Sequence, residues 1–166
     1  MKEQQKDIPP DFSKDVSELA KKDSKTAIED YERIMNRIFD EEIYRTMAYN
    51  YYLEKKYDES TLEIKKALKL NPDNFAAYYN WGVNSGKLGR YEESIEKYRK
   101  ATELNPDYGK AWYNIACAYS LQNMKMEALE NLKKAIELDP NYKEKAKKDE
   151  DFKNLWQDED FKKLVE

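Results

Sequence analysis

The chain has 166 residues and a formal net charge of −4, from 30 basic and 34 acidic side chains that are mixed along its whole length. It contains 1 Cys and no His, which excludes a disulfide scaffold, a Cys/His zinc site and every catalytic mechanism that needs an imidazole. Because no segment has an excess of basic residues, we expect no nucleic-acid partner. The 14 Tyr and 3 Trp are too many for a disordered chain.

The sequence has no apolar run near the ~20 residues that a membrane-spanning helix needs, so we expect no membrane insertion. Its first residues also lack the apolar stretch of a secretory signal peptide. We therefore expect a cytoplasmic protein, with the periplasm as the alternative if a leader peptide has been removed.

Residues 1–10 are polar and contain two prolines, which predicts a flexible tail. Residues 11–40 carry an apolar stripe at helical spacing, and Thr26 and Glu29 have the spacing of a capping box. The stripe consists of Ile28, Tyr31, Met35 and Ile38. Two interpretations of 11–40 have equal weight: N-terminal capping helices, or a degenerate copy of the repeat that follows.

A repeat of 34 residues begins at residue 41 and divides the chain into units at 41–74, 75–108 and 109–142. Seven columns keep this spacing in all three units without an insertion, which chance does not produce. Among the recurring residues are the prolines Pro72, Pro106 and Pro140, the small residues Ala48, Gly82 and Ala116, and the expected neighbours of these, Ser60, Ser94 and Ala128.

Each unit has the pattern of two helices joined by a short turn. In 109–142, apolar residues at i, i+3, i+4 and i+7 from Trp112 predict a first helix, and a second apolar stripe follows a polar break at Gln122-Asn123. The small residues let the two helices approach closely, and the proline ends the second helix. With only 4 Gly and 5 Pro available for turns, the fold class is predicted to be all-α.

Residues 41–142 resemble the tetratricopeptide repeat family, whose unit is a helix–turn–helix of this length. The motif in the second unit consists of Tyr78, Trp81, Gly82, Gly89, Arg90, Tyr91, Ser94, Tyr98, Ala101 and Pro106. The resemblance implies a right-handed superhelix (α-solenoid) of antiparallel helix pairs. It also implies a concave face, formed by the first helix of each unit, that binds a protein or peptide partner.

Residues 143–166 contain two copies of an acidic-Phe-x-x-Leu phrase, which begin at Asp151-Phe152 and Asp160-Phe161. We interpret this segment as C-terminal capping helices, because the last repeat would otherwise expose an apolar face. The alternative is a detachable arm that docks on a partner or in the groove of its own chain.

The sequence offers few groups for catalysis. The acidic pairs Glu41-Glu42 and Glu92-Glu93 fall at predicted helix starts, where they complement the helix dipole. No base is predicted near Cys117, no glycine-rich phosphate loop is present, and the acidic runs near the C-terminus lack the ligand spacing of an EF-hand. We therefore expect no enzyme, no catalytic residue, no metal and no cofactor.

The predicted binding site is the concave groove, at the first-helix positions that face away from the second helix. Tyrosine recurs at these positions, and it is enriched at binding hot spots. The predicted groove residues are Arg45, Tyr49, Tyr52, Tyr79, Asn80, Val83, Lys87, Lys110, Tyr113, Asn114 and Cys117. Because Arg45, Lys87 and Lys110 are basic, we expect an acidic segment or a C-terminus as the ligand. Self-association through the caps or the groove is a further expectation.

A general protein–protein interaction scaffold fits the sequence best, and two more specific functions stay open. Some members of the family grip the C-terminal carboxylate of a heat-shock chaperone with a clamp of Lys, Asn and Arg side chains. Arg45, Asn80 and Lys110 match this clamp, whereas Tyr49 and Asn114 depart from it. Three repeats with an N-terminal helical extension also suit a small secretion-type chaperone.

Overall fold

The computed structural model describes the backbone of residues 24–166 and the side chains from residue 26 onward, except that of Ile28. The predicted flexible tail 1–10, the segment 11–23 and the Ile28 position of the apolar stripe lie outside the described residues. The helices are α2 (Ser24–Leu53), α3 (Tyr57–Leu70), α4 (Phe75–Lys87), α5 (Tyr91–Leu104), α6 (Gly109–Leu121), α7 (Lys125–Leu138), α8 (Asn141–Ala146), the short 3-10 helix η1 (Glu150–Leu155) and α9 (Glu159–Val165).

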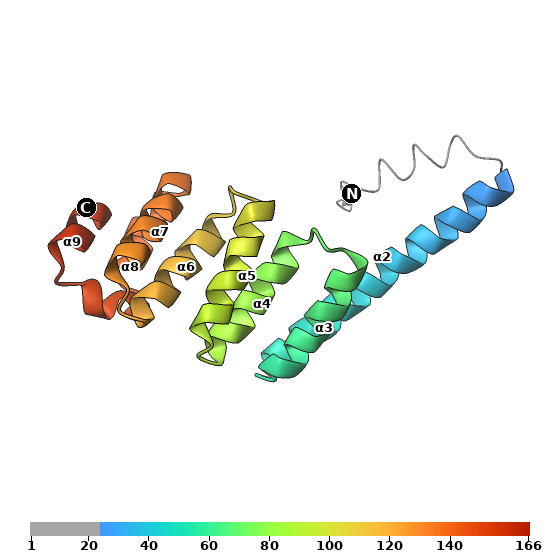
Figure 1. Cartoon of the computed structure of the whole chain (residues 1–166), viewed down its shortest axis with the longest axis horizontal. Helices are drawn as coiled ribbons and strands as arrows, with labels where there is room; N and C mark the ends of the chain where they lie inside the picture. Colours follow the sequence, from blue (N-terminus) through green and yellow to red (C-terminus); the bar gives the residue numbers. More distant parts are fainter. Residues whose placement is uncertain (1–23) are drawn as a thin grey trace, which may run out of the picture.

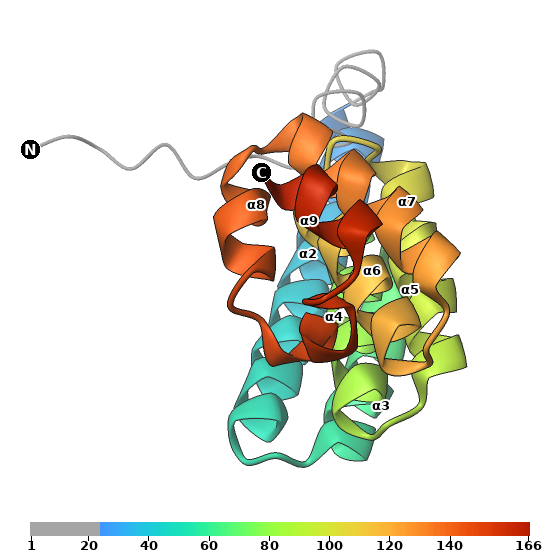
Figure 2. The same cartoon turned by 90° about the vertical axis from the view of Figure 1, so that its left-hand side faces the viewer.

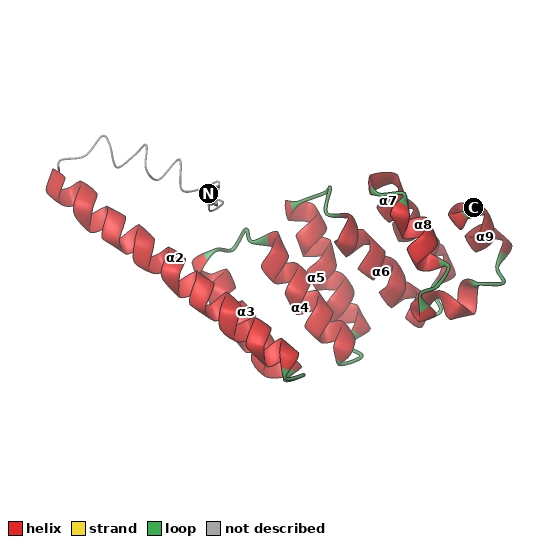
Figure 3. Cartoon of the chain, turned by 180° about the vertical axis from the view of Figure 1, so that it is seen from behind, coloured by secondary structure: helices red, strands yellow, loops and turns green. Residues whose placement is uncertain are grey.

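Helices α2 to α7 form three antiparallel pairs that stack side by side, α2 with α3, α4 with α5 and α6 with α7 (Figure 1). The described part of the chain contains helices and connecting loops and no strand (Figure 3). The predicted all-α superhelix is thereby confirmed. None of the described helices is both long enough and apolar enough to cross a membrane.

Helix α2 is one continuous helix of 30 residues that runs through the boundary expected between residues 40 and 41. Its sequence holds neither Gly nor Pro, so nothing in it breaks the helix at that point. Its N-terminal part extends beyond α3 (Figure 1), and its exposed apolar side chains include Phe39 and Ile43. Residues 24–40 are therefore an extension of the first unit's first helix rather than an element separated from it by a turn.

The turn between the two helices of each unit contains one residue with positive φ. These residues are Lys55 (φ 60°), Gly89 (φ 72°) and Asn123 (φ 60°), and they are 34 residues apart in the sequence. The residue after each of them donates its backbone N–H to a carbonyl five residues earlier, as Arg90 does to Ser85 at 2.9 Å. This is the hydrogen bond of a helix that ends in a left-handed residue, and it fixes where each second helix starts.

Within each pair, small residues bring the two backbones close together. The Ser60 hydroxyl donates to the carbonyl oxygen of Ala48 at 2.8 Å, and Ser94 donates in the same way to Gly82 at 2.8 Å. Both serines are buried, so these bonds also satisfy hydroxyl groups that water does not reach. The columns of small residues in the sequence therefore mark the contact between the two helices of a pair.

The pairs meet at three joints that differ in their packing. We call the contact of α2 and α3 with α4 the first joint, that of α4 and α5 with α6 the second, and that of α6 and α7 with residues 141–165 the third. The larger buried apolar cluster lies in the second and third joints, and a smaller one, with Ala48, Ile64, Leu68 and Ala77, lies in the first. The first joint is thus the least filled with apolar side chains.

Residues 141–165 close the C-terminal end of the stack (Figure 2), where α8 and α9 pack on α7 and η1 packs on α6. Phe152 and Phe161, the aromatic residues of the two repeated phrases, are both buried, and their ring centroids are 5.8 Å apart. Leu155 and Val165 are buried beside them. An arm that detached from the stack would expose all four side chains to water, which makes this segment part of the core.

Candidate peptide-binding groove

One cleft, of about 550 Å³, lies in the first joint, between the first helices of the first two units. Six of the eleven predicted groove residues line it: Arg45, Tyr49 and Tyr52 on α2, and Tyr79, Asn80 and Val83 on α4. The floor comes from α3, where Ser60, Ile64 and Ala67 face the cleft. Tyrosine rings on the walls and small or aliphatic side chains on the floor make a surface suited to an inserted side chain.

The polar groups of the cleft include two charged side chains and the amide of Asn80. Arg45 and Glu42, one helical turn apart on α2, both line it, so it carries one charge of each sign. Within the part of the chain that the structure describes, neither the Arg45 guanidinium nor the Asn80 side-chain amide has a hydrogen bond or an ion pair. Both side chains are exposed and available to a ligand.

The floor of the cleft was not foreseen from the sequence. Both Ser60 and Ile64 belong to a second helix, and the sequence predicts for Ser60 a contact with the first helix of its own unit. The Asn84 side chain, also on the wall, donates to the Ser60 hydroxyl at 2.9 Å and so ties α4 to α3. The sequence signal for this floor is Ile64, which stands 34 residues before Tyr98 and so puts a smaller side chain at the same position of the repeat.

In the second joint, aromatic side chains occupy the corresponding space. The ring centroids of Tyr79 and Tyr98 are 5.5 Å apart, and those of Tyr79 and Tyr108 are 5.1 Å apart. The amide of Asn114 donates to the hydroxyls of Tyr79 at 3.1 Å and Tyr98 at 3.2 Å. Burial raises the pKa of Tyr79 to about 12, which keeps its phenol protonated. Asn114, a predicted groove residue, is therefore engaged within the fold.

In the third joint, the structure corrects the prediction for Tyr113 and Cys117. Tyr113 is 1% exposed and Cys117 7% exposed, because residues 141–155 cover this part of the concave face. The Tyr113 hydroxyl donates to the Asp149 carboxylate at 2.8 Å, and its ring stacks on Tyr142 with a centroid distance of 4.8 Å. Neither residue is open to a partner, since the chain's own C-terminal segment is bound there.

The three basic residues predicted for the groove do not lie together in the structure. Lys87 and Lys110 are exposed but do not line the cleft, so among the described residues Arg45 is the basic residue that lines it. Over the covered third unit, the Lys145 ammonium lies 3.9 Å from the ring centroid of Tyr113, a cation–π contact. The positive charge of the concave face is therefore spread along the stack rather than gathered in the cleft.

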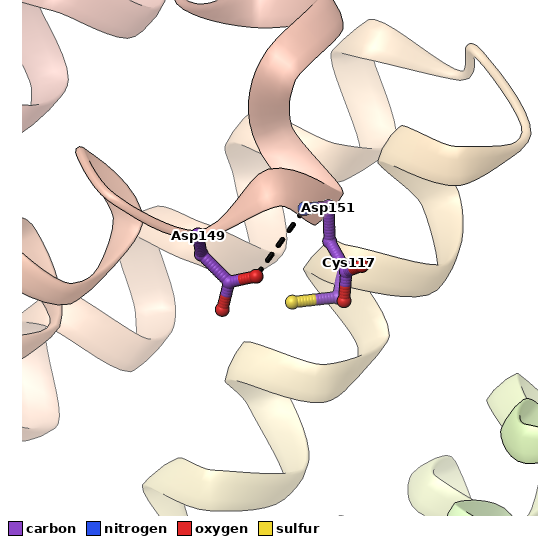
Figure 4. Close-up of side chains that lie close together, drawn as sticks. All are labelled: Cys117, Asp149 and Asp151. Atoms are coloured by element: carbon purple, nitrogen blue, oxygen red, sulfur yellow. Dashed lines mark hydrogen bonds between the residues drawn. The ribbon is translucent and has the colours of Figure 1, made fainter.

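Cys117, Asp149 and Asp151 bring three groups that could hold a metal ion to within 4.8 Å of one another (Figure 4). Asp149 already accepts hydrogen bonds from the Tyr113 hydroxyl and, at 3.2 Å, from the backbone N–H of Asp151. Burial raises the pKa of the Cys117 thiol well above its usual value, and a thiol must lose its proton to bind a metal. These contacts fit a cap that is held to α6.

Comparison with known proteins agrees with this geometry. The family model described as "Tetratricopeptide repeat" matches residues 109–142, and one described as "TPR repeat" matches residues 87–123. The structure named "MamA AMB-1" is 31% identical over 70% of this chain and 69% of its own, with a TM-score of 0.56. The chain belongs to the tetratricopeptide repeat family. As a member, it is a protein–protein interaction scaffold.

Other tetratricopeptide repeat structures share the fold at lower identity. A second structure of MamA has a TM-score of 0.66 at 18% identity and covers 84% of this chain and 80% of its own. The first TPR of Spaghetti (RPAP3), bound to the HSP90 peptide SRMEEVD, has a TM-score of 0.62 at 20% identity, with 76% of this chain and 94% of its own covered. No curated protein matches the sequence.

Proposed function

We propose that the cleft of the first joint binds a segment of a partner protein. The observation that carries the proposal is the division of the concave face: the third unit is covered by the chain's own C-terminal segment, whereas the first two units leave a lined cleft. Tyr49, one of the residues that line the cleft, is 61% exposed, so most of its ring is open to a partner. Exposed aromatic rings around a concave site are typical of binding hot spots.

A photo-crosslinking amino acid in place of Tyr49 tests this proposal. In a lysate of the source cells, we expect Tyr49-labelled protein to crosslink to a partner. The matched control carries the same label in place of Met126, which is 74% exposed on α7 outside the cleft. A second substitution pair, Tyr49→Ala with Tyr52→Ala, should remove the same partner from a pull-down. Equal crosslinking from both positions, or an unchanged pull-down, would contradict the proposal.

A chaperone carboxylate clamp is the second candidate, because Arg45 and Asn80 line the same cleft. Two of the solved relatives are bound to such ligands, an HSP90 peptide and, for the yeast Sti1 TPR2B domain at 21% identity, Hsp70. The engaged Asn114 amide weakens this candidate, since it stands where a clamp needs a free cation. Calorimetry with the peptide SRMEEVD and its C-terminal amide distinguishes a clamp from a general peptide-binding cleft. Only a clamp should bind the amide more weakly, because the amide lacks the charge of the terminal carboxylate.

We propose further that the cleft binds without catalysing a reaction. The sequence has no His, and the raised pKa of Cys117 keeps its thiol protonated and unsuited to nucleophilic attack at neutral pH. The expected cytoplasmic location and the alternative of a small secretion-type chaperone stay predictions from the sequence.

A further inference from the structure

The second joint shows which side chain fills the space that is open in the first. The Tyr98 ring lies directly beneath Gly82, so close that a Cβ added to Gly82 would be 2.6 Å from the ring carbons. Tyr79 packs on the same ring with a centroid distance of 5.5 Å, and Asn114 donates to its hydroxyl at 3.2 Å. A tyrosine ring between two first helices, held by an asparagine amide, is thus part of the packing of the second joint.

The first joint has counterparts of these positions but lacks the ring. One repeat earlier, Ile64 stands at the position of Tyr98, Ala48 at that of Gly82 and Asn80 at that of Asn114. Ile64, Ala48 and Asn80 all line the cleft of about 550 Å³. Asn80 therefore keeps the donor that holds a tyrosine hydroxyl in the second joint, and in the described part of the chain this donor has no acceptor.

Arg45 completes the site, because it stands at the position of Tyr79, the side chain that packs on the Tyr98 ring. A guanidinium stacks on an aromatic face as well as a phenol ring does, and it adds the attraction of its charge to the ring quadrupole. The donor, the stacking group and the apolar floor of the second joint thus all have a counterpart in the first.

We propose that the cleft of the first joint binds a tyrosine side chain presented by a segment of a partner protein. The ring packs on Ile64 beside Arg45, and its hydroxyl accepts a hydrogen bond from Asn80. The next part of the same concave face carries a precedent for a tyrosine supplied from another segment, since Tyr142 of the C-terminal segment stacks on Tyr113 of α6 at 4.8 Å. This inference rests on the proposed function and names the ligand group that the cleft selects.

The test titrates N-acetyltyrosinamide into the full chain and follows the Ile64 methyl and Asn80 side-chain amide signals by NMR. We expect saturable shifts of both signals, and an affinity about five-fold lower for N-acetylphenylalaninamide, which lacks the hydroxyl. N-acetylleucinamide should cause no saturable shift. Equal affinities for the tyrosine and phenylalanine amides, or shifts confined to other residues, would overturn the inference.

Substitutions in and outside the cleft locate the site. The double variant Ala48→Gly with Ile64→Tyr places in the first joint the residues that Gly82 and Tyr98 supply in the second. It should abolish binding, because the new tyrosine ring fills the cleft. The matched control, Leu62→Tyr, adds a tyrosine at a position on α3 that is 55% exposed and should leave the affinity unchanged. Should the double variant fail to fold, Asn80→Leu on the exposed wall must still erase the preference for tyrosine over phenylalanine.

The outcomes also separate this inference from the proposed function. If the tyrosine amide does not bind while crosslinking from the Tyr49 position persists, the tyrosine site is contradicted and the proposed binding of a partner segment in the cleft is retained. If crosslinking fails as well, both the tyrosine site and the proposed function are contradicted.

Discussion

The ring of Tyr98 occupies the place where a side chain on Gly82 would stand. An added Cβ would lie 2.6 Å from two ring carbons and 3.1 Å from the backbone oxygen of Ser94. We therefore expect Gly82→Ala to destabilise the protein. Overpacking of this kind costs about 1–3 kcal/mol, more than the roughly 1 kcal/mol that alanine gains over glycine in a helix. Denaturant unfolding measures the difference.

A second substitution should rescue this variant. The first unit combines Ala48 with Ile64 at the positions of Gly82 and Tyr98, so the repeat accepts a methyl group when the facing ring is absent. Gly82→Ala with Tyr98→Ile should then be more stable than the sum of the two single changes, because the residues are in contact. Strictly additive losses would show that the ring and the glycine are not coupled.

Of the three turn residues with positive φ, Lys55 is the residue type least suited to the left-handed backbone conformation. Its φ of 60° matches the conformation of Gly89 and Asn123, but a lysine there carries the steric cost of its Cβ. That cost is roughly 1–2 kcal/mol, and glycine's greater freedom in the unfolded chain offsets part of it. Lys55→Gly should therefore raise the free energy of unfolding by about 0.5–1 kcal/mol.

The neighbouring residue gives the control for this change. Lys56 has a φ of −88°, where glycine releases no strain, and its ammonium pairs with Glu54 at 2.7 Å. Lys56→Gly should not stabilise the protein. If both variants gain stability equally, the left-handed conformation at Lys55 is not the cause.

The sequence predicted the repeat units because their packing is local and recurs in fixed columns. The serine of the second helix in the first two units and the small residue 12 positions earlier, such as Ser60 and Ala48, meet within one unit, so spacing alone pairs them. The helix pairs and the α-solenoid follow from these local contacts.

The location of the groove depends on contacts that repeat spacing does not encode. Tyr113 and Tyr79 share a column, yet Tyr113 is buried because residues 141–155 fold back over it. The open cleft in the first joint likewise depends on differences between the joints, Ile64 at the position of Tyr98 and Arg45 at that of Tyr79, whose effect shows only when the joints are compared in space. The unbroken α2 was missed because a repeat boundary was read as a helix boundary.

The C-terminal segment should protect the Cys117 thiol. Cys117 is 7% exposed on α6, against which η1 packs, and Phe152 of η1 is fully buried. Phe152→Ala should cost about 3–5 kcal/mol, as large-to-small changes in a core do, and should speed the reaction of Cys117 with a disulfide reagent. Met126→Ala, at an exposed position on α7, is the control and should change neither quantity. A thiol that reacts in the unaltered chain as fast as in the unfolded chain would contradict the burial.

The tyrosines of the second and third joints should make the fold unstable in alkali. Burial raises the pKa of Tyr79 to about 12 and also raises those of Tyr98 and Tyr113. An unfolded tyrosine loses its proton near pH 10, so between about pH 10 and 12 the unfolded state holds fewer protons than the folded state. The stability from these groups is therefore fully present below about pH 10 and is lost as the pH rises through this window.

Urea unfolding at a series of alkaline pH values, with tyrosinate absorbance to follow ionisation, measures this dependence. Each such tyrosine contributes a slope of up to about 1.4 kcal/mol per pH unit while the two states differ by one proton. Tyr79→Phe removes one titrating group from the second joint, so its stability should fall less steeply above about pH 10. An unchanged slope in this variant would show that the Tyr79 phenol is not shielded from water as the structure places it.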